Sequence, residues 1–325
     1  MADKKVRIII GALFVSFVYL LVNFALTAQE IKRSIHQLEG SPLSHQERHH
    51  ILLIAQELDN PYWRKIEKGA RDAAELYGVD LEYTGPYRNN LEDQIKLIEK
   101  SIFSKVDGII VQGLNAAAFT PVINEAQNKG VPLITVDTDA PTSKRLSYVG
   151  TNNQEAGKLL GHKVVQMTAG RGDIGVIMGD ETADNMRQRL DGFQQVVEKF
   201  DRLRIVSVLS SNISRIQAVQ QTEAMLRAHP EINIMVGTSA LDAVGILQAV
   251  KTLKREDILI FGFDDLDETL LSIAQGSIQA TVIQKPYEMG FDSVKMMNLY
   301  LNGKAIQEIQ YTPIEIIDQN NVRLE

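Results

Sequence analysis

Cysteine is absent from the 325 residues of this chain. Its absence excludes disulfides, thiolate metal ligands, cysteine nucleophiles and lipid attachment through an N-terminal cysteine. It does not decide the compartment, because exported proteins do not all carry disulfides. Basic clusters are also missing, since the net charge is −7 and the basic residues form only scattered pairs such as Lys144-Arg145. We therefore expect no nucleic-acid partner.

The motifs of nucleotide, hydrolytic and zinc chemistry are missing too. There is no G-x-x-x-x-G-K-[ST] segment, and Gly172, Gly175 and Gly179 lack the spacing of the dinucleotide fingerprint. Neither a G-x-S-x-G nucleophile elbow nor an H-E-x-x-H zinc helix occurs. These absences predict a protein that is not an enzyme and that uses no cofactor and no metal.

The N-terminus contains a long uncharged stretch over residues 8–29. A helix over residues 8–28 would be roughly 30 Å long, about the thickness of the hydrocarbon core of a bilayer. Lys4, Lys5 and Arg7 precede it, so the positive-inside rule keeps the tip in the cytoplasm and places the remaining chain outside. This pattern predicts a single-pass protein of the cell membrane whose soluble part is extracytoplasmic.

A cleaved signal peptide is the alternative interpretation of this stretch. Its apolar core is normally shorter, and Leu26 two residues before Ala28 makes a poor cleavage site. We therefore favour an uncleaved anchor, with residues 1–29 forming the cytoplasmic tip and the membrane segment. Residues 30–50 then form a polar linker, in which Gly40-Ser41-Pro42 breaks any long helix.

From residue 51 onward the chain alternates apolar strands with amphipathic helices. Such alternation is typical of parallel sheets joined by crossover helices. The pattern restarts near residue 150, and in each half an apolar strand ends in aspartate, at Asp137 and at Asp264. We predict an α/β fold of two doubly wound parallel-sheet lobes. The strands are expected at residues 51–55, 80–83, 108–111, 132–136, 173–178, 204–208, 233–237 and 258–263.

The only tryptophan of the chain lies in the segment Asn60-Pro61-Tyr62-Trp63. Pro61 suits the first position of a helix, Asp59 or Asn60 can cap that helix, and Gly78 ends it. The aromatic pair therefore follows the carboxyl end of the first strand, the edge at which ligands bind in open α/β sheets. An exposed ring there suits the C–H face of a sugar or an aromatic base. The alternative is that one of the rings only packs in the core.

Planar polar side chains are expected at the same edge. Carboxylate, guanidinium and amide groups can each bond two neighbouring hydroxyls, which suits a polyol. Each also has an ordinary structural alternative, because an aspartate after a strand can cap a helix and Arg187 can pair with Asp184 or Asp191. The candidates are Asn60, Asp137, Arg187, Asp264 and Gln284.

Taken together, these segments resemble periplasmic sugar-binding proteins of the ribose, galactose and xylose type, over roughly residues 51–325. Residues 60–63 are similar to the family's N-P-aromatic-aromatic segment, and residues 131–137 to its V-P-[VIL]-[IV]-x-x-D strand. Arg187 through Phe193 resembles an R-x(4)-G-F helix, residues 262–264 a G-F-D segment, and Gln284 a glutamine before the last crossover. In that family these positions surround a monosaccharide.

The resemblance implies that two rings face the sugar and that five polar side chains bond its hydroxyls. The implied ligand set is Asn60, Tyr62, Trp63, Asp137, Arg187, Asp264 and Gln284. Three positions depart from the ribose-binding pattern, because Thr138 replaces an arginine, Ile213 lies near an aromatic position and Ser239 replaces an asparagine. We expect these three to line an altered pocket, with Gln56 and Glu57 supplying replacement polar contacts.

The resemblance also implies a hinge of three chain crossings, near residues 149–152, 284–286 and 312–313. The N-terminal lobe would then comprise residues 51–150 with 285–312, and the C-terminal lobe residues 151–284 with 313–325. In the family, the bound sugar holds the two lobes closed, and a partner protein recognises the closed surface.

The function expected is a membrane-anchored monosaccharide receptor, with a pentose such as xylose favoured. Its partner would be a sensor histidine kinase of the LytS type, because a spanning anchor resembles the membrane-anchored xylose-binding proteins. The alternative partner is an ABC permease, although importer proteins of cells with one membrane usually carry a lipidated cysteine. A transcription regulator is disfavoured because residues 1–50 offer no DNA-reading helix-turn-helix.

Overall fold

The computed structural model describes residues 19, 22–24, 26–27, 29, 48–104 and 106–324. The chain divides into two compact units, Met1–Glu47 and Arg48–Glu325. In the first unit the described residues are helical, and no helix within the described ranges is long and apolar enough to cross a membrane. The predicted anchor at residues 8–28 and the predicted linker at residues 30–50 lie largely outside the described residues.

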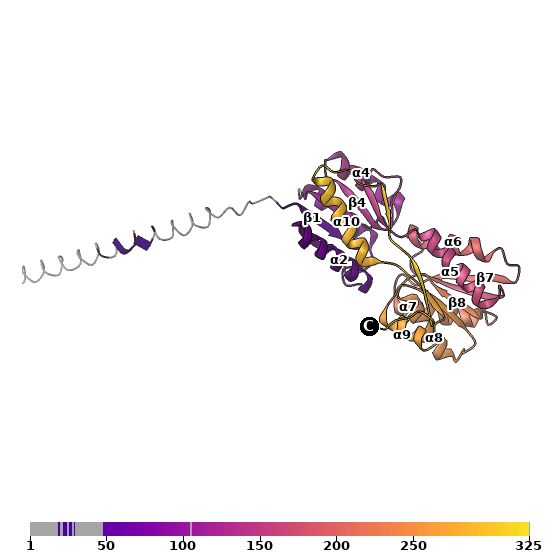
Figure 1. The fold of residues 1–325 in the computed structure, drawn as a ribbon. Coiled ribbons are helices and arrows are strands. Elements are labelled where there is room, and N and C mark those ends of the chain that lie inside the picture. The colour runs from indigo at the N-terminus through magenta and orange to yellow at the C-terminus, as the bar shows by residue number, and fades with distance from the viewer. Residues whose placement is uncertain are drawn as a thin grey trace, which may run out of the picture. The chain divides into compact units, whose positions relative to one another are not determined.

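The second unit contains two six-stranded sheets (Figure 1). The strands of the first sheet are β1 (His50–Ile54), β2 (Asp80–Thr84), β3 (Gly108–Val111), β4 (Leu133–Asp137), β5 (Ser147–Gly150) and β11 (Ile309–Tyr311). Their order is β11-β5-β4-β3-β1-β2, and the neighbouring strands are parallel.

The second sheet repeats this plan. Its strands are β6 (Gly172–Met178), β7 (Leu203–Ser210), β8 (Ile234–Gly237), β9 (Leu259–Phe263), β10 (Ala280–Ile283) and β12 (Glu315–Asp318). The order is β12-β10-β9-β8-β6-β7, with β12 antiparallel to β10 and the other pairs parallel. The predicted two-lobe α/β fold with parallel sheets is confirmed.

Helices cover both faces of each sheet, which explains why the central strands are continuous apolar runs. Around the first sheet these are α2 (Pro61–Tyr77), α3 (Leu91–Phe103), α4 (Ala116–Asn128) and α10 (Pro286–Leu301). Around the second sheet they are α5 (Asn153–Thr168), α6 (Asp184–Val197), α7 (Arg215–Ala228), α8 (Asp242–Leu253) and α9 (Asp267–Ala274).

Helix α2 begins and ends where the sequence predicts. The Asn60 side chain accepts a hydrogen bond from the Tyr62 N–H, at 3.0 Å, and Pro61 occupies the first helical position. Gly78 ends the helix with a left-handed backbone, φ 68°, which glycine adopts without steric cost. These caps fix the first turn of α2, and with it Tyr62 and Trp63, directly after β1.

The chain passes between the two sheets at three places. These lie between β5 and α5, between β10 and α10, and between β11 and β12 (Figure 1). Helix α10 returns to the first lobe, where Gly290 meets the backbone of α2 at Ile66. Each lobe therefore contains chain from two separate parts of the sequence.

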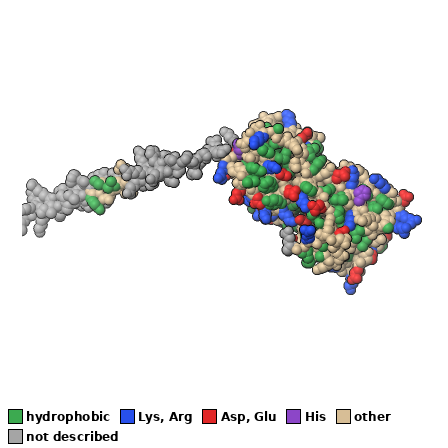
Figure 2. All heavy atoms as spheres, viewed as in Figure 1, with side chains coloured by type: hydrophobic (Ala, Val, Ile, Leu, Met, Phe, Trp, Pro, Cys, Tyr) green, Lys and Arg blue, Asp and Glu red, His purple; other side chains and the backbone are tan. Residues whose placement is uncertain are grey.

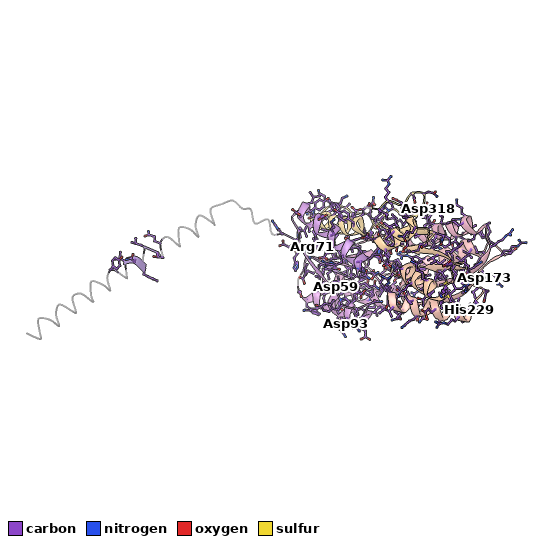
Figure 3. The ribbon with its side chains drawn as sticks, turned by 90° about the horizontal axis from the view of Figure 1, so that it is seen from below. Asp59, Arg71, Asp93, Asp173, His229 and Asp318 are labelled. Carbon is purple, nitrogen blue, oxygen red and sulfur yellow. The ribbon has the colours of Figure 1, made fainter. Side chains whose placement is uncertain are left out.

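On the face drawn in Figure 2, acidic and basic side chains are mixed. Charged side chains of the second lobe form ion pairs across neighbouring elements, for example Lys163 with Asp318 at 2.6 Å and Arg204 with Asp173 at 2.7 Å. Figure 3 shows Asp173, His229 and Asp318 on the second lobe, and Asp59, Arg71 and Asp93 on the first.

Candidate functional site

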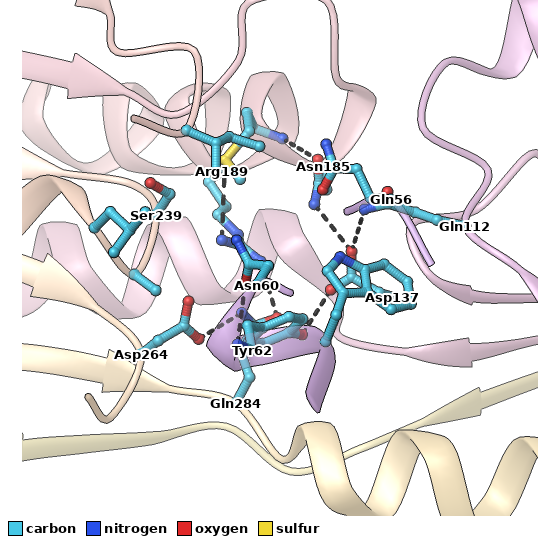
Figure 4. A pocket seen from close by; sticks show the side chains of 15 residues that line it. Gln56, Asn60, Tyr62, Gln112, Asp137, Asn185, Arg189, Ser239, Asp264 and Gln284 are labelled. Atoms are coloured by element: carbon cyan, nitrogen blue, oxygen red, sulfur yellow. Dashed lines mark hydrogen bonds between the residues drawn. The ribbon is translucent and has the colours of Figure 1, made fainter. Parts of the chain in front are cut away.

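A cavity lies between the two lobes, at the carboxyl ends of the strands of both sheets (Figure 4). It contains about 420 Å³ of space outside the protein atoms, mouth included. The lining residues are Gln56, Asn60, Tyr62, Trp63, Gln112, Asp137, Asn185, Met186, Arg189, Ile213, Ser239, Ala240, Leu241, Asp264 and Gln284. Nine of the twelve sequence candidates lie here, and Arg187, Thr138 and Glu57 do not.

The residues that line the cavity from one lobe are called the wall of that lobe, and Asp137 lies at the centre of the first-lobe wall. Its Oδ1 accepts a hydrogen bond from the Tyr62 hydroxyl at 2.6 Å, and its Oδ2 accepts one from Gln112 Nε2 at 2.6 Å. Thr138 lies behind the wall, where its hydroxyl donates to Asp137 Oδ2 at 3.0 Å. Burial, followed by the negative charge of Asp137, raises the pKa of Tyr62 well above its ordinary value. The Tyr62 hydroxyl therefore stays protonated and serves as a donor.

Asp264 is the corresponding carboxylate of the second-lobe wall. Its Oδ1 accepts a hydrogen bond from Gln284 Nε2 at 2.8 Å. Gln284 Oε1 in turn accepts from Arg189 Nη2 and from the Thr151 hydroxyl, both at 2.8 Å. Burial raises the pKa of Asp264 to about 6, and the Arg189 charge opposes this rise. At neutral pH the cavity therefore contains a second buried acceptor of hydrogen bonds.

The arginine of the cavity is Arg189, which corrects the prediction of Arg187. Arg187 is exposed, donates to Glu181 O at 2.9 Å and pairs with Asp184 on its own helix. Arg189 is 2% exposed and donates to Asn153 Oδ1, Thr238 O and Gln284 Oε1 at 2.8 to 2.9 Å. Two residues turn a helix by about 200°, so the two side chains lie on opposite faces of α6.

Trp63 belongs to both the core and the cavity. Its side chain is only 2% exposed and packs in the cluster around Ile51, Leu53 and Ile66. It also lines the cavity, and its ring meets that of Tyr62 edge to face at a centroid distance of 6.4 Å. Packing and cavity lining, the two alternatives from the sequence, therefore hold for the same ring.

Sequence reasoning missed six lining residues, of which three are polar. Gln112 follows β3 just as Asp137 ends β4, so the strand-edge argument could have found it. Arg189 shares a helical stripe with Met186 and Phe193, at spacings of three and four. Asn185 lies beside that stripe, and its Nδ2 donates weakly to Asp137 Oδ2 at 3.4 Å.

Two buried polar atoms at the cavity have no hydrogen-bond partner among the residues that the structure describes, namely Gln112 Oε1 and Ser239 Oγ. Buried polar atoms are normally paired, so each of these can bond a guest molecule. They lie on opposite lobes, as do the two carboxylates. Within the described residues, no group of three or more histidine, aspartate or glutamate side chains could hold a metal ion.

The two lobes contact each other beside the cavity. Asp184 of α6 accepts a hydrogen bond from the Ala116 N–H of α4 at 2.6 Å, and its own N–H donates to Leu114 O at 3.0 Å. On another side, Lys65 pairs with Asp265 at 2.7 Å. The conformation is therefore the one in which the lobes are closed.

The sequence profile of the periplasmic binding protein domain family matches residues 51–305. The chain belongs to this family. As a periplasmic binding protein it is similar to GanP, a glucose-galactose binding protein from Geobacillus stearothermophilus, whose crystal structure has 44% sequence identity. The TM-score is 0.84, and the match covers 86% of this chain and 100% of GanP.

Two further relatives of this periplasmic binding protein differ in their partners. The XylFII-LytSN complex contains a chain with 34% identity and a TM-score of 0.81, matched over 85% of this chain and 99% of that chain. The D-apiose import binding protein of Actinobacillus succinogenes is 25% identical over 277 residues, which cover 84% of this chain and 89% of that protein. Membership in a family of sugar-binding proteins agrees with the expectation of a binding protein rather than an enzyme.

Proposed function

We propose that the protein is an extracytoplasmic receptor that closes its two lobes around one monosaccharide. The observation that carries this proposal is the pair of buried carboxylates, Asp137 and Asp264, facing one cavity from opposite lobes. Ionised acceptors make hydrogen bonds about twice as strong as neutral ones, and hydroxyls of one sugar ring can reach both. The Tyr62 and Trp63 rings supply the apolar surface that a sugar ring also needs.

The sugar proposed first is an aldopentose such as xylose. The similarity to the XylFII chain supports this choice. The second candidate is an aldohexose, glucose or galactose, because GanP has the higher identity. The two candidates differ by one hydroxymethyl group, so the space beside the ring decides between them.

Binding is tested by titrating the purified protein with D-xylose, D-ribose, L-arabinose, D-glucose and D-galactose. Calorimetric heat and Trp63 fluorescence should both respond to at least one sugar, with micromolar or tighter affinity, about 8 kcal/mol. Tryptophan emission is a specific reporter because the chain has one tryptophan and its ring lines the cavity. Absence of heat with every sugar in the panel would refute the proposal.

The output proposed is signalling to a membrane sensor kinase, from a position anchored by residues 8–28. The uncharged stretch at residues 8–29 and the relative in the XylFII-LytSN complex support it. The second candidate is the binding component of an ABC importer, which the D-apiose import binding protein supports. Both outputs use the sugar-closed form, so the partner distinguishes them.

Affinity purification of the full chain from native membranes, with and without its sugar, tests the output. Recovery of a histidine kinase that increases with sugar is the expected result. Recovery of a permease and its ATPase instead would assign the importer. The anchor is tested in the same membranes, since alkaline carbonate washing should release a version that starts at residue 48 but not the full chain.

A further inference from the structure

The turn after β7 has an unusual backbone next to the cavity. Asn212 and Ile213 are consecutive and both left-handed, with φ of 48° and 54°. Asparagine tolerates this conformation, but a β-branched residue with positive φ is a genuine outlier. Ile213 also lines the cavity. A conformation of this kind persists only where neighbouring groups hold it, and such strain concentrates at functional sites.

Three hydrogen bonds hold this turn in place. The Ile213 N–H donates to Gly179 O at 2.7 Å, and the Ser211 N–H donates to Met178 O at 2.8 Å. The third bond comes from a side chain, because the Ser211 hydroxyl donates to Asp242 Oδ1 at 2.6 Å. Ser211 and Asp242 are both completely buried, so water does not compete for this bond.

The same carboxylate also holds a second loop of the cavity. Asp242 Oδ2 accepts from the Ser239 N–H at 2.8 Å and from the Thr238 N–H at 3.2 Å. Ser239 lines the cavity and carries one of its two unpaired polar atoms. One buried carboxylate therefore joins the turn after β7 to the loop after β8, and each of them supplies part of the second-lobe wall.

The Asp242 carboxylate lies in the first turn of α8, where the helix dipole favours a negative charge, and its side-chain bonds go to the two loops. It does not line the cavity, and among the described residues its hydrogen-bond donors are one hydroxyl and two backbone N–H groups, with no lysine or arginine. Burying an ionisable group without a cation is costly, and the core could be filled by an apolar side chain at this position. The retained carboxylate is explained if the two loops must be held in one arrangement.

We propose that Asp242 is a positioning residue for sugar selectivity, which holds Ile213 and Ser239 in the arrangement that shapes the second-lobe wall. This inference rests on the proposed sugar-binding function. Without the carboxylate, Ile213 is free to leave its left-handed conformation and the Ser239 loop loses two bonds. The wall then accommodates sugars of different shape more equally, and the discrimination between them falls.

Asparagine should replace Asp242 with little loss. Its Oδ1 can accept the two backbone N–H bonds, and its Nδ2 can donate to Ser211 Oγ. The Ser211 hydroxyl is then free to donate to Met178 O or Gly179 O, each 3.5 Å away. Alanine offers none of these bonds. Both variants lack the negative charge, so the Asp242→Ala and Asp242→Asn variants differ in these bonds and not in charge.

The experiment measures the dissociation constants of D-xylose, D-glucose and D-galactose for the full chain purified in detergent. The variants are Asp242→Ala, Asp242→Asn, Ser211→Ala and, as a matched control, Ser272→Ala. Ser272 donates its hydroxyl to Glu268 O within α9, away from the cavity. Asp242→Ala should weaken the tightest sugar about tenfold and reduce the ratio between the weakest and tightest sugars about fivefold.

The Asp242→Asn and Ser272→Ala variants show whether the loss of selectivity comes from losing the bonds that hold the two loops. Asp242→Asn and Ser272→Ala should each keep the selectivity ratio within about twofold of the wild type, whereas Ser211→Ala should lower it about threefold. If Asp242→Ala does not fold, Ser211→Ala decides alone. An unchanged ratio in the folded Asp242→Ala and Ser211→Ala variants, or an equal loss of selectivity in Ser272→Ala, overturns the inference.

Hydrogen exchange of the sugar-free protein supplies a readout that does not depend on binding. The amides of residues 211–214 and 238–241 should exchange faster in Asp242→Ala than in Asp242→Asn, with β6 and β9 unchanged. Equal protection of both loops in the two variants overturns the inference. A wild-type protein that binds none of the sugars refutes the proposed function instead, and the two failures are therefore distinguishable.

Discussion

Asp137 and Asp264 hold corresponding places in the two lobes. Asp137 ends β4 and Asp264 follows β9, and both have a left-handed backbone, with φ of 65° and 67°. Residues other than glycine adopt this conformation rarely, and it is kept where surrounding bonds fix it. Tyr62 and Gln112 bond the first carboxylate, and Gln284 bonds the second. The strained backbone therefore belongs to Asp137 and Asp264, the two residues whose carboxylates are proposed to bind the sugar.

Substitution of Arg189 tests which arginine serves the cavity. Arg189→Met removes the donor that fixes Gln284, and through it Asp264, so sugar affinity should fall at least about tenfold, or 1.4 kcal/mol. Arg187→Met is the matched control, because that guanidinium is exposed, and its partners among the described residues are Glu181 O and Asp184. Calorimetric titration measures both. The conclusion that Arg189 serves the cavity is wrong if the two variants bind sugar with equal affinity, or if Arg187→Met binds it more weakly.

The pKa of Asp264, raised to about 6 by burial, predicts a pH effect on stability. Between the unfolded pKa near 3.9 and the folded value, the native protein retains a proton that the unfolded chain releases. The contribution of this group to stability therefore decreases as pH rises through that window. From pH 4 to pH 7, the wild type should lose about 2 kcal/mol of unfolding free energy relative to Asp264→Asn.

The difference in unfolding free energy is measured by guanidinium denaturation. The sugar-free wild type and Asp264→Asn are compared at pH 4, 5, 6 and 7. Subtracting the variant cancels the other titrating groups, including Asp318 and Asp257, whose pKa values their basic neighbours lower. A difference that stays constant, or that increases with pH, contradicts the raised pKa.

At the scale of elements, two helix pairs with close backbones carry the site residues. In the second lobe, a Cβ on Gly157 of α5 would lie 2.0 Å from Arg189 O, and one on Gly192 of α6 would lie 2.0 Å from Gln154 O. In the first lobe, Gly69 of α2 and Gly290 of α10 are related in the same way, at 1.9 Å. Each pair of glycines lets two helices approach closely, and so fixes the helix that presents side chains to the cavity.

The Gly157→Ala substitution tests this arrangement because the new methyl group collides with the Arg189 backbone. The helices must separate, at a cost of about 3 kcal/mol, and sugar affinity should fall as Arg189 shifts. The control is Gly303→Ala, where φ is 71° but nothing lies within 4 Å, so backbone strain alone costs about 1 kcal/mol. Denaturation and titration of both variants provide the comparison. Equal losses of stability, with unchanged affinity, would contradict the role of the close contact.

Elements with local signals could be predicted from the sequence. Asn60, Pro61 and Gly78 mark both ends of α2, and the apolar runs before Asp137 and Asp264 mark buried parallel strands. Helix α6 has no such mark, because Ala183 precedes it without a side-chain cap. Its first N–H donates to Leu114 O of the other lobe, a contact that no local pattern contains. The prediction of Arg187 rested on the spacing of residues 187–193, and spacing alone does not tell which face of α6 meets the cavity.

At the scale of the whole molecule, closure of the lobes is supported by contacts that do not involve the cavity. Asp184 of the second lobe bonds the first N–H of α4, where the positive end of the helix dipole favours a carboxylate. Asn89 of the first lobe donates to Asp180 Oδ2 at 2.8 Å and accepts from Gln56 Nε2 at 3.1 Å. Since Gln56 lines the cavity, this short chain of bonds connects the cavity to the contact between lobes.

These contacts predict that the closed state can be weakened without touching the sugar. Asp184→Ala removes a bond that exists only when the lobes are closed, which should lower the fraction of closed protein. The apparent affinity falls by the same fraction for every sugar, about fivefold to thirtyfold for a bond of 1 to 2 kcal/mol. Selectivity between sugars stays constant, because no group that lines the cavity has changed.

Titration with two sugars and small-angle scattering of the sugar-free and sugar-saturated protein measure this effect. Asp173→Ala is the matched control, since its carboxylate pairs with Arg204 inside the second lobe (Figure 3). It should change neither affinity nor radius of gyration. A selectivity change in Asp184→Ala would mean that this carboxylate shapes the cavity, whereas an unchanged affinity would mean that the contact between lobes adds nothing to closure. If contacts outside the cavity support closure, Asp184→Ala must lose affinity for both sugars by the same factor. Its radius of gyration must also be larger than that of the wild type before sugar is added.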